Sequence, residues 1–365
     1  MSQAFTEAAL LDALKTVVDP QTGKDFVSSR ALKNLRIDAG EVSFQIEMGY
    51  PAKSQHAALR KGLVAAARGV AGVGNVSVEL VTRVASHAVQ RGVQLLPKVK
   101  NVIAVASGKG GVGKSTTTVN LALALAAEGA TVGILDADIY GPSQPMMMGL
   151  SGRPESEDGK TIAPLVNYGV QVMSIGFMIE PDQAMIWRGP MATQALDQLL
   201  HQTQWGDLDY LLIDMPPGTG DIALTLSQRV PLTGAIIVTT PQDIALLDAK
   251  KGLKMFEKVG VPILGIVENM AVYCCPNCGH TEHIFGADGG KRMAAEYKVD
   301  YLGALPLNMS IREQADSGRP TVVADPDGEI AATYKAVARS VAVKIALKAK
   351  DFSAKFPTIS VSKAT

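Results

Sequence analysis

The sequence has little that would suit a secreted or a membrane-spanning protein. Its 365 residues contain only three cysteines, Cys274, Cys275 and Cys278, which lie too close together to form a disulfide framework. No apolar run approaches the roughly 18 residues of a transmembrane helix, and residues 1–30 lack a basic stretch followed by an apolar core. Lysine and arginine (35) balance aspartate and glutamate (35), so no net charge attracts nucleic acid or anionic membrane. We therefore expect a cytoplasmic protein that binds neither.

Length and composition indicate two domains. The chain is 47% hydrophobic and 19% charged, which is enough apolar material for a large core. Residues 1–83 predict a small α+β domain without any catalytic constellation, so we expect an accessory role for it. Residues 84–98 mix serine, histidine, glutamine, arginine and proline without periodicity, as is typical of a linker. The predicted elements of the small domain are helices near 8–15 and 54–68 and strands at 41–48 and 75–81.

Residues 99–350 predict an α/β domain in which short apolar runs alternate with helical patterns. This alternation is typical of a doubly wound, mostly parallel sheet with helices on both faces. A helix is expected over residues 329–350, and a polar tail over 351–365. The predicted strands are 102–106, 131–135, 170–175, 210–213, 234–239, 263–267 and 301–304.

The most informative stretch is residues 108–115, which fit the phosphate-binding pattern G-x-x-x-x-G-K-[ST] between a predicted strand and a helix over 116–128. Such a P-loop directs backbone N–H groups at a polyphosphate, while Lys114 reaches its β- and γ-phosphates and Ser115 can bind Mg²⁺. A glycine-rich turn without a ligand is the weaker alternative. The predicted nucleotide-binding residues are Gly108, Lys109, Gly110, Gly111, Val112, Gly113, Lys114, Ser115 and Thr116.

Aspartates follow two of the predicted strands, where ligands bind in an open parallel sheet. Asp214 follows one strand and is placed to hold Mg²⁺ through water. Asp136 and Asp138 follow another strand, and Asp138 opens a flexible loop, so we favour Asp138 for orienting the attacking water. The alternatives are a helix-capping aspartate at 214 and a turn aspartate at 138.

Lys109 is a second lysine inside the phosphate-binding loop. Most P-loops need only Lys114, and an exposed loop lysine is ordinarily solvated. Glycines flank Lys109, so it has few local partners. We expect it to reach a phosphate bound to a second subunit, as an arginine finger does.

The pair Cys275 and Cys278 has the spacing C-x-x-C, for which three uses compete. A redox pair would begin a helix, whereas this one lies in a predicted loop. A zinc site would need His280 and His283, which lie very close to the cysteines. An iron–sulfur cluster usually takes four thiolates, and two chains related by a two-fold axis would supply them. Spacing alone favours an iron–sulfur cluster site over a zinc site, and a zinc site over a redox-active cysteine pair.

Together these stretches resemble the Mrp/ApbC family of iron–sulfur cluster carrier ATPases, and more distantly the MinD/ParA proteins and the nitrogenase iron protein. The resemblance covers about residues 99–345, and residues 1–83 look like the small domain that precedes the ATPase in many bacterial members. Further matching stretches are Trp187-Arg188-Gly189-Pro190-Met191, residues 136–143, residues 214–221 and residues 268–270.

The resemblance implies an ATP-binding homodimer that holds a labile [4Fe-4S] cluster between two Cys275/Cys278 pairs and transfers it to apo-proteins. Lys109 then matches the signature lysine that reaches the partner's nucleotide, and Asp138 matches the water-orienting acid. Asn269 matches an adenine contact. Cys274, next to Cys275, departs from the family pattern. A ligand set in which Cys274 takes the place of Cys275 therefore remains an alternative.

Two rival functions remain at this point. A MinD/ParA-like positioning ATPase that cycles on membrane or DNA would carry a basic amphipathic terminal helix or a basic DNA-binding face. The stretch 341–350 contains three lysines, but it is short and alanine-rich and is more simply interpreted as a helix packed on the sheet. A zinc-stabilised ATPase adaptor would use the cysteines for structure alone.

Overall fold

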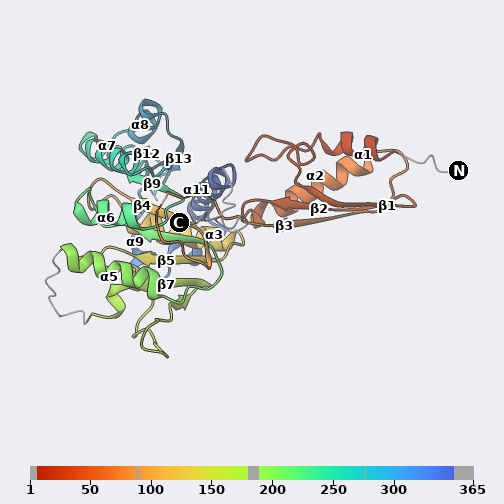
Figure 1. Cartoon of the computed structure of the whole chain (residues 1–365). Coiled ribbons are helices and arrows are strands. Elements are labelled where there is room, and N and C mark those ends of the chain that lie inside the picture. Colours follow the sequence, from red (N-terminus) through yellow and green to blue (C-terminus); the bar gives the residue numbers. More distant parts are fainter. Residues whose placement is uncertain (1–5, 88, 91, 180–188, 276, 349–365) are drawn as a thin grey trace, which may run out of the picture.

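The computed structural model contains two sheets with their covering helices, and a small hairpin (Figure 1). One sheet has three strands in the order β1-β2-β3, and the other has eight in the order β13-β10-β9-β4-β8-β5-β7-β6. The structure describes residues 6–87, 89–90, 92–179, 189–275 and 277–348.

The small sheet is built from β1 (Leu32–Asp38), β2 (Glu41–Met48) and β3 (Val76–Thr82), with α1 (Glu7–Leu14) and α2 (His56–Arg68) packed on one face. β2 alternates exposed and buried residues, as a strand with one solvated face does. Both predicted helices and both predicted strands of this domain are present. β1 was not predicted, because all of its residues are exposed or only partly buried and the run lacks apolar alternation.

The large sheet confirms the predicted doubly wound α/β fold. All of its neighbouring strands are parallel except β6 and β7, which pair antiparallel at one edge. The edge strand β6 was not predicted, since three residues carry no periodicity. The strands are β4 (Val99–Ala106), β5 (Val132–Asp136), β6 (Leu165–Asn167), β7 (Val170–Ser174), β8 (Leu208–Asp214), β9 (Gly234–Thr239), β10 (Ile263–Glu268) and β13 (Tyr301–Ala304).

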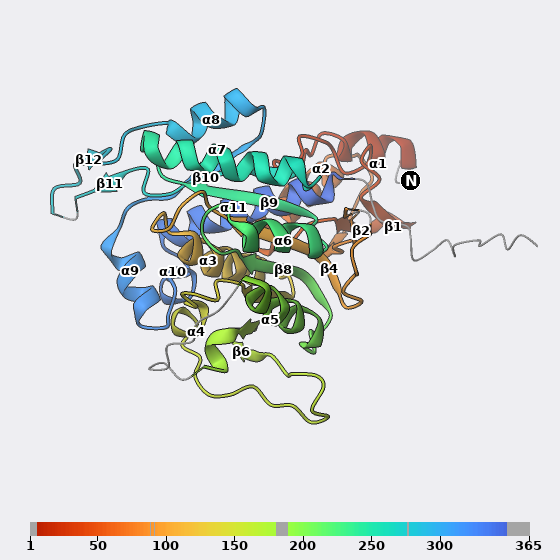
Figure 2. The ribbon, with the colours of Figure 1, turned by 60° about the vertical axis from the view of Figure 1, so that its left-hand side comes forward.

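Helices cover both faces of the large sheet (Figure 2). On β4, Ile103 and Val105 join the apolar cluster that includes α3 and α11, whereas Val102 and Ala104 join the cluster that includes α5 to α8. The strand is therefore buried on both sides, as predicted for a parallel sheet. The helices are α3 (Lys114–Ala127), α4 (Gln144–Met147), α5 (Gly189–Gln202), α6 (Asp221–Arg229), α7 (Asp243–Lys258), α8 (Gly289–Tyr297), α9 (Met309–Asp316), α10 (Thr321–Ala324) and α11 (Glu329–Ala346).

The predicted linker packs along the large domain. Leu96 is buried, and the Gln90 amide donates to the backbone carbonyls of Ser227 and Val230, at the end of α6. Val84 and His87 are also buried. The proposed boundaries at residues 83 and 98 remain a prediction.

The last turns of the chain pack against the large domain. α11 buries Val341 and Ala342, Lys344 forms an ion pair with Asp300, and Lys348 Nζ donates to the Thr233 carbonyl at 2.7 Å. Burial lowers the pKa of Lys348 to about 8. Residues 349–350 and the predicted tail lie outside the described residues. None of the helices in the described ranges is long and apolar enough to cross a membrane.

A buried ionic contact joins the two domains at the C-terminal end of α3. The Glu128 carboxylate, 1% exposed, accepts hydrogen bonds from the Ser54 N–H (2.9 Å) and hydroxyl (2.6 Å) of the small domain. Arg339 of α11 donates to the same carboxylate at 2.5 Å. Because α3 begins at Lys114, one helix connects the phosphate-binding loop with the small domain.

We expect Arg339→Ala to lower the free energy of unfolding by about 2 kcal/mol, since it removes a charged hydrogen bond from a buried carboxylate. Arg312→Ala is the matched control, because Arg312 pairs with Asp316 and Glu313 on the exposed side of α9 and such pairs contribute little. Urea unfolding followed by circular dichroism measures both. Equal stability losses in the two variants would contradict the role of the contact.

Candidate functional site

The phosphate-binding loop lies between β4 and α3, as the sequence predicts. Gly111 and Gly113 have φ of 81° and 80°, which only glycine adopts easily. A Cβ atom on Gly108 would lie 2.0 Å from the Asp248 carbonyl carbon, so this glycine is required by close packing. A Cβ on Gly110 or Gly111 would meet nothing within 4 Å, so the loop has open space beside it. This geometry fits a bound phosphate chain.

Lys114 and Asp214 form a buried ion pair beneath the loop. Their side chains are 6% and 0% exposed, and Lys114 Nζ lies 2.6 Å from Asp214 Oδ1. The Thr118 hydroxyl lies 3.1 Å from the same oxygen and 2.9 Å from the Lys114 carbonyl, so its single proton is shared between two acceptors. Lys114 Nζ also lies 3.2 Å from the Ser115 hydroxyl. The oxygen atoms of Ser115 and Asp214 thus surround the positively charged Lys114 ammonium. Oxygen atoms of this kind are also the ligands that Mg²⁺ prefers.

Asp136 and Asp138 lie beside this pair but have different surroundings. Asp136 is fully buried and accepts backbone hydrogen bonds from Ser143 and Gln144, both at 3.0 Å. Burial raises the pKa of Asp136 to about 7, and the charge of Asp214 adds to the effect. Asp136 therefore holds the start of α4 in place.

Asp138 is the more accessible of the two aspartates. Its side chain is 14% exposed and lies 4.0 Å from Lys114 Nζ. Burial raises the pKa of Asp138. Asp138 is thus placed to contact a group at the phosphate end of the site.

Lys109 and Asn269 both lie at the phosphate-binding loop, but only the Asn269 side chain is hydrogen-bonded to it. The Lys109 ammonium has no hydrogen-bond or ionic partner among the residues that the structure describes, which leaves it able to contact another molecule. Asn269 is 7% exposed, and its amide donates to the Val112 carbonyl at 2.9 Å. It braces the phosphate-binding loop, and its adenine contact remains a prediction. The preceding Glu268 accepts from the Gly290 N–H and so caps α8.

The cysteines lie on a two-stranded hairpin of β11 (Tyr273–Cys274) and β12 (Thr281–Glu282), which projects from the large domain (Figure 2). Cys274 and Cys278 are exposed and Cys275 is half-buried. The backbone N–H groups of Cys278 and Asn277 lower the pKa of Cys275, which favours the thiolate that binds metal. Pro276 lies outside the described residues.

Among the described residues, the two nearby histidines are not grouped with these cysteines as a metal site. Across residues 6–348 as described, no three His, Cys, Asp or Glu residues are grouped to hold a metal ion. His283 instead donates from Nδ1 to the Ala271 carbonyl at 2.7 Å. The geometry therefore gives no support to the Cys₂His₂ alternative within one chain.

The hairpin is connected to the phosphate-binding loop by a short segment. Asn269 contacts Val112 of the loop, and Met270 has a left-handed φ of 55°. The segment is then fixed by the Leu307 N–H, which donates to the Val272 carbonyl at 2.8 Å. A short, hydrogen-bonded segment therefore joins the phosphate-binding loop to the base of the hairpin.

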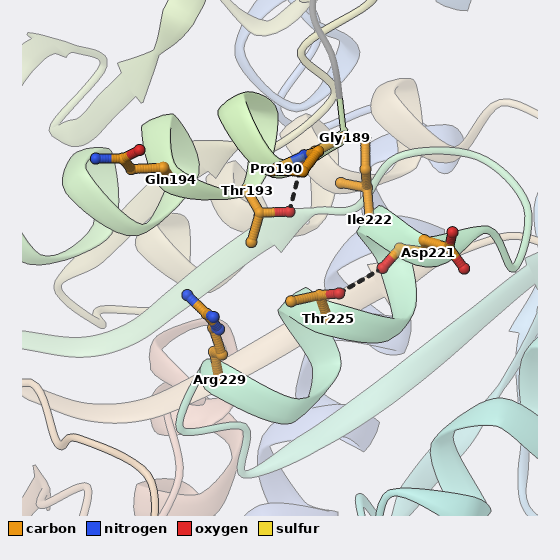
Figure 3. Close-up of a pocket in the computed structure, with 8 residues that line it drawn as sticks. All are labelled: Gly189, Pro190, Thr193, Gln194, Asp221, Ile222, Thr225 and Arg229. Carbon is orange, nitrogen blue, oxygen red and sulfur yellow. Dashed lines mark hydrogen bonds between the residues drawn. The ribbon is translucent and has the colours of Figure 1, made fainter.

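A separate cavity of about 490 Å³ lies between α5 and α6 (Figure 3). Arg229 extends from the last turn of α6 towards α5, and Asp221 lies at the opposite end of α6, where the helix begins. Trp187 and Arg188, which carried part of the family resemblance, lie outside the described residues, and α5 begins at the next residue. None of the P-loop residues lines this cavity. Its lining residues are Gly189, Pro190, Thr193, Gln194, Asp221, Ile222, Thr225 and Arg229.

Two polar residues of the site were not predicted from the sequence. Thr118 lies one helical turn after Lys114, so its position facing Asp214 could have been found from the i, i+4 spacing. Gln144 contacts Asp214 from a different part of the chain, and no spacing in the sequence signals it.

Comparison with known proteins relates this chain to iron–sulfur cluster proteins and to P-loop NTPases. Residues 98–342 match the family described as NUBPL iron-transfer P-loop NTPase, and residues 7–78 match the family described as iron-sulfur cluster assembly protein. A Pseudomonas fragi protein named iron-sulfur cluster carrier protein is 59% identical over 269 residues, which are 73% of this chain and 94% of that protein. A Synechocystis protein of the same name is 44% identical over 350 residues, 94% of this chain and 99% of that protein. The nucleotide-binding protein of Archaeoglobus fulgidus, solved with ADP, is 39% identical, with a TM-score of 0.56 over 64% of this chain and 90% of that one.

Proposed function

The chain belongs to the family of iron-transfer P-loop NTPases, and we propose that it is an ATP-dependent carrier that binds a labile [4Fe-4S] cluster and transfers it to apo-proteins. One observation carries this proposal. A phosphate-binding loop and a cysteine pair, of which Cys278 is exposed and Cys275 half-buried, are joined through Asn269, which contacts the loop six residues before Cys275. The relatives in the comparison carry names that describe cluster transport.

In the ATPase part of the mechanism, the phosphate-binding loop and the residues beside it bind and orient the phosphates of ATP. Lys114 exchanges its bond to Asp214 for the β- and γ-phosphates, and the loop N–H groups hold the remaining oxygens. Bound by Ser115 and Asp214, Mg²⁺ would neutralise charge that develops on the phosphates. Asp138 orients the attacking water, and Lys109 contacts the nucleotide of a second copy.

In the metal half, two copies of the chain share one cluster. Each chain offers one cysteine pair with the spacing of cluster ligands, and four thiolates are the usual ligand set. A homodimer with its two-fold axis beside the hairpins would bring both pairs together. Nucleotide binding then changes how well the four thiolates hold the cluster, through the Asn269 segment.

The rival functions have less support. A membrane-positioning ATPase would need a basic terminal helix, but Lys344 and Lys348 are bound to the large domain. A zinc adaptor would need a complete ligand set, which the described residues of one chain do not assemble. Because exposed thiolates persist only where thiols are kept reduced, we propose a cytoplasmic protein whose partners are cluster donors and apo-proteins, with no nucleic acid or membrane.

The proposal is tested by anaerobic reconstitution with iron and sulfide. The dimer should acquire visible charge-transfer absorption with four iron and four sulfide ions per two chains. The loaded protein should then activate an apo-protein acceptor, at rates that differ between ATP, ADP and no nucleotide. Stoichiometric zinc with no iron-dependent absorption would instead support the adaptor.

Lys109 and Lys114 are expected to serve different steps. Lys114→Ala should weaken ATP binding about 10- to 100-fold, because a charged hydrogen bond to the phosphates is lost. Lys109→Ala should keep most of the affinity but lose hydrolysis, because its target is the other subunit's nucleotide. Calorimetry and phosphate release measure the two effects. Equal affinity losses in both variants would argue against contact across the interface.

A further inference from the structure

Gln144 occupies a position in the nucleotide site that neither the sequence nor the family resemblance assigns. It is the first residue of α4 and is fully buried. Its backbone N–H donates to Asp136 Oδ2 at 3.0 Å, which fixes where its side chain begins. A polar side chain in such a buried position is stable only when its hydrogen-bonding groups are satisfied.

The Gln144 side chain bridges the two residues that we assign to Mg²⁺. Its amide nitrogen donates to Asp214 Oδ2 at 2.9 Å and to the Ser115 carbonyl at 3.1 Å. Both N–H groups are therefore used. The amide oxygen is buried and has no hydrogen-bond partner among the residues that the structure describes. An unpaired buried acceptor is unfavourable, and a ligand that donates a hydrogen bond would satisfy it.

Asp214 divides its two carboxylate oxygens between different partners. Oδ1 accepts from Lys114 and lies 3.1 Å from the Thr118 hydroxyl, which also contacts the Lys114 carbonyl, whereas Oδ2 accepts from Gln144. When Lys114 turns to the phosphates, Thr118 and Gln144 are the partners that still hold the carboxylate. Groups that orient a metal-binding carboxylate in this way affect metal affinity almost as much as the ligands do.

We propose that Gln144 is a positioning residue for the Mg²⁺–nucleotide complex, an inference that rests on the proposed function. Its amide nitrogen keeps Asp214 oriented after Lys114 has left, and its free oxygen accepts a hydrogen bond from a water molecule bound to Mg²⁺. Magnesium usually keeps several waters when a protein binds it, so a buried acceptor beside Ser115 and Asp214 suits its hydration shell.

The test compares ADP binding with and without Mg²⁺ in the full-length protein. Gln144→Met keeps the length of the side chain but removes both polar groups. With fluorescently labelled ADP present, the Mg²⁺ concentration at half-saturation should rise about 10- to 100-fold. ADP affinity in EDTA should change much less, since Gln144 contacts Asp214 and the Ser115 carbonyl rather than the Lys114 ammonium or a loop N–H group. This split between metal-dependent and metal-independent binding is one that a merely structural role would not produce.

Gln314→Met is the matched control, because the Gln314 amide oxygen is also buried and unpaired among the described residues but lies in α9. It should leave the Mg²⁺ midpoint unchanged. If Gln144→Met does not fold, Gln144→Asn replaces it, since this variant keeps the amide but shortens its reach by one methylene and should show the same rise. An unchanged midpoint, or an equal loss of ADP affinity in EDTA, would overturn the role of Gln144. Failure of the wild-type protein to bind ADP would overturn the proposed function itself.

Discussion

Replacement of Cys275 or Cys278 by alanine is expected to abolish cluster binding, whereas Cys274→Ala should leave most of it. Each chain would contribute two thiolates to a shared cluster, so either loss removes two of the four ligands of the dimer. Cys275 is the residue whose thiolate the hairpin stabilises, through the N–H groups of Cys278 and Asn277. Anaerobic reconstitution followed by visible absorption and iron and sulfide counting measures the effect.

Cys274 is the matched control within the same hairpin. It is exposed like Cys278, but it lies on β11, where it pairs with Thr281, rather than in the turn. Its thiol is 3.7 Å from the Gly279 carbonyl. Loss of the cluster in the Cys274 variant, with retention in the Cys275 variant, would show that the ligand set is shifted by one residue. Retention of the cluster in all three cysteine variants would show that the hairpin does not bind it.

Asp138→Asn is expected to reduce ATP hydrolysis by about 100-fold or more while ATP binding survives. The substitution keeps the size of the side chain but removes the charge that orients or deprotonates water. Burial raises the pKa of Asp138, so wild-type hydrolysis should fall as the pH drops through that raised value and the carboxylate becomes protonated. The variant should lack this dependence. Phosphate release across a pH series and calorimetry with ATP measure the two properties.

Asp221→Asn is the control for this experiment. Asp221 also follows β8 but begins α6 at the cavity shown in Figure 3, so most of the hydrolysis should remain. Unchanged turnover in the Asp138 variant would return Asp138 to the role of a turn residue. The water-orienting group would then be sought at Asp136.

Local signals in the sequence were sufficient for most of the fold. Short apolar runs predicted every strand of the large sheet except β6, and glycine spacing predicted the phosphate-binding loop with its helix. β1 and β6 were missed because neither has a strong buried pattern of its own. These strands are held by pairing with β2 and β7, and pairing depends on the neighbouring strand rather than on local composition.

The sequence by itself determined the phosphate-binding loop and the cysteine pair, because glycine conformation, lysine charge and thiolate spacing are properties of adjacent residues. Only the tertiary structure decided which side chains meet. It paired Lys114 with Asp214, assigned Asp136 to the start of α4, and placed Gln144 against Asp214 across 70 positions of the chain. Contacts of this kind depend on strand order and on how elements pack, which no short window of sequence contains. For that reason Gln144 could be recognised only after the fold was known.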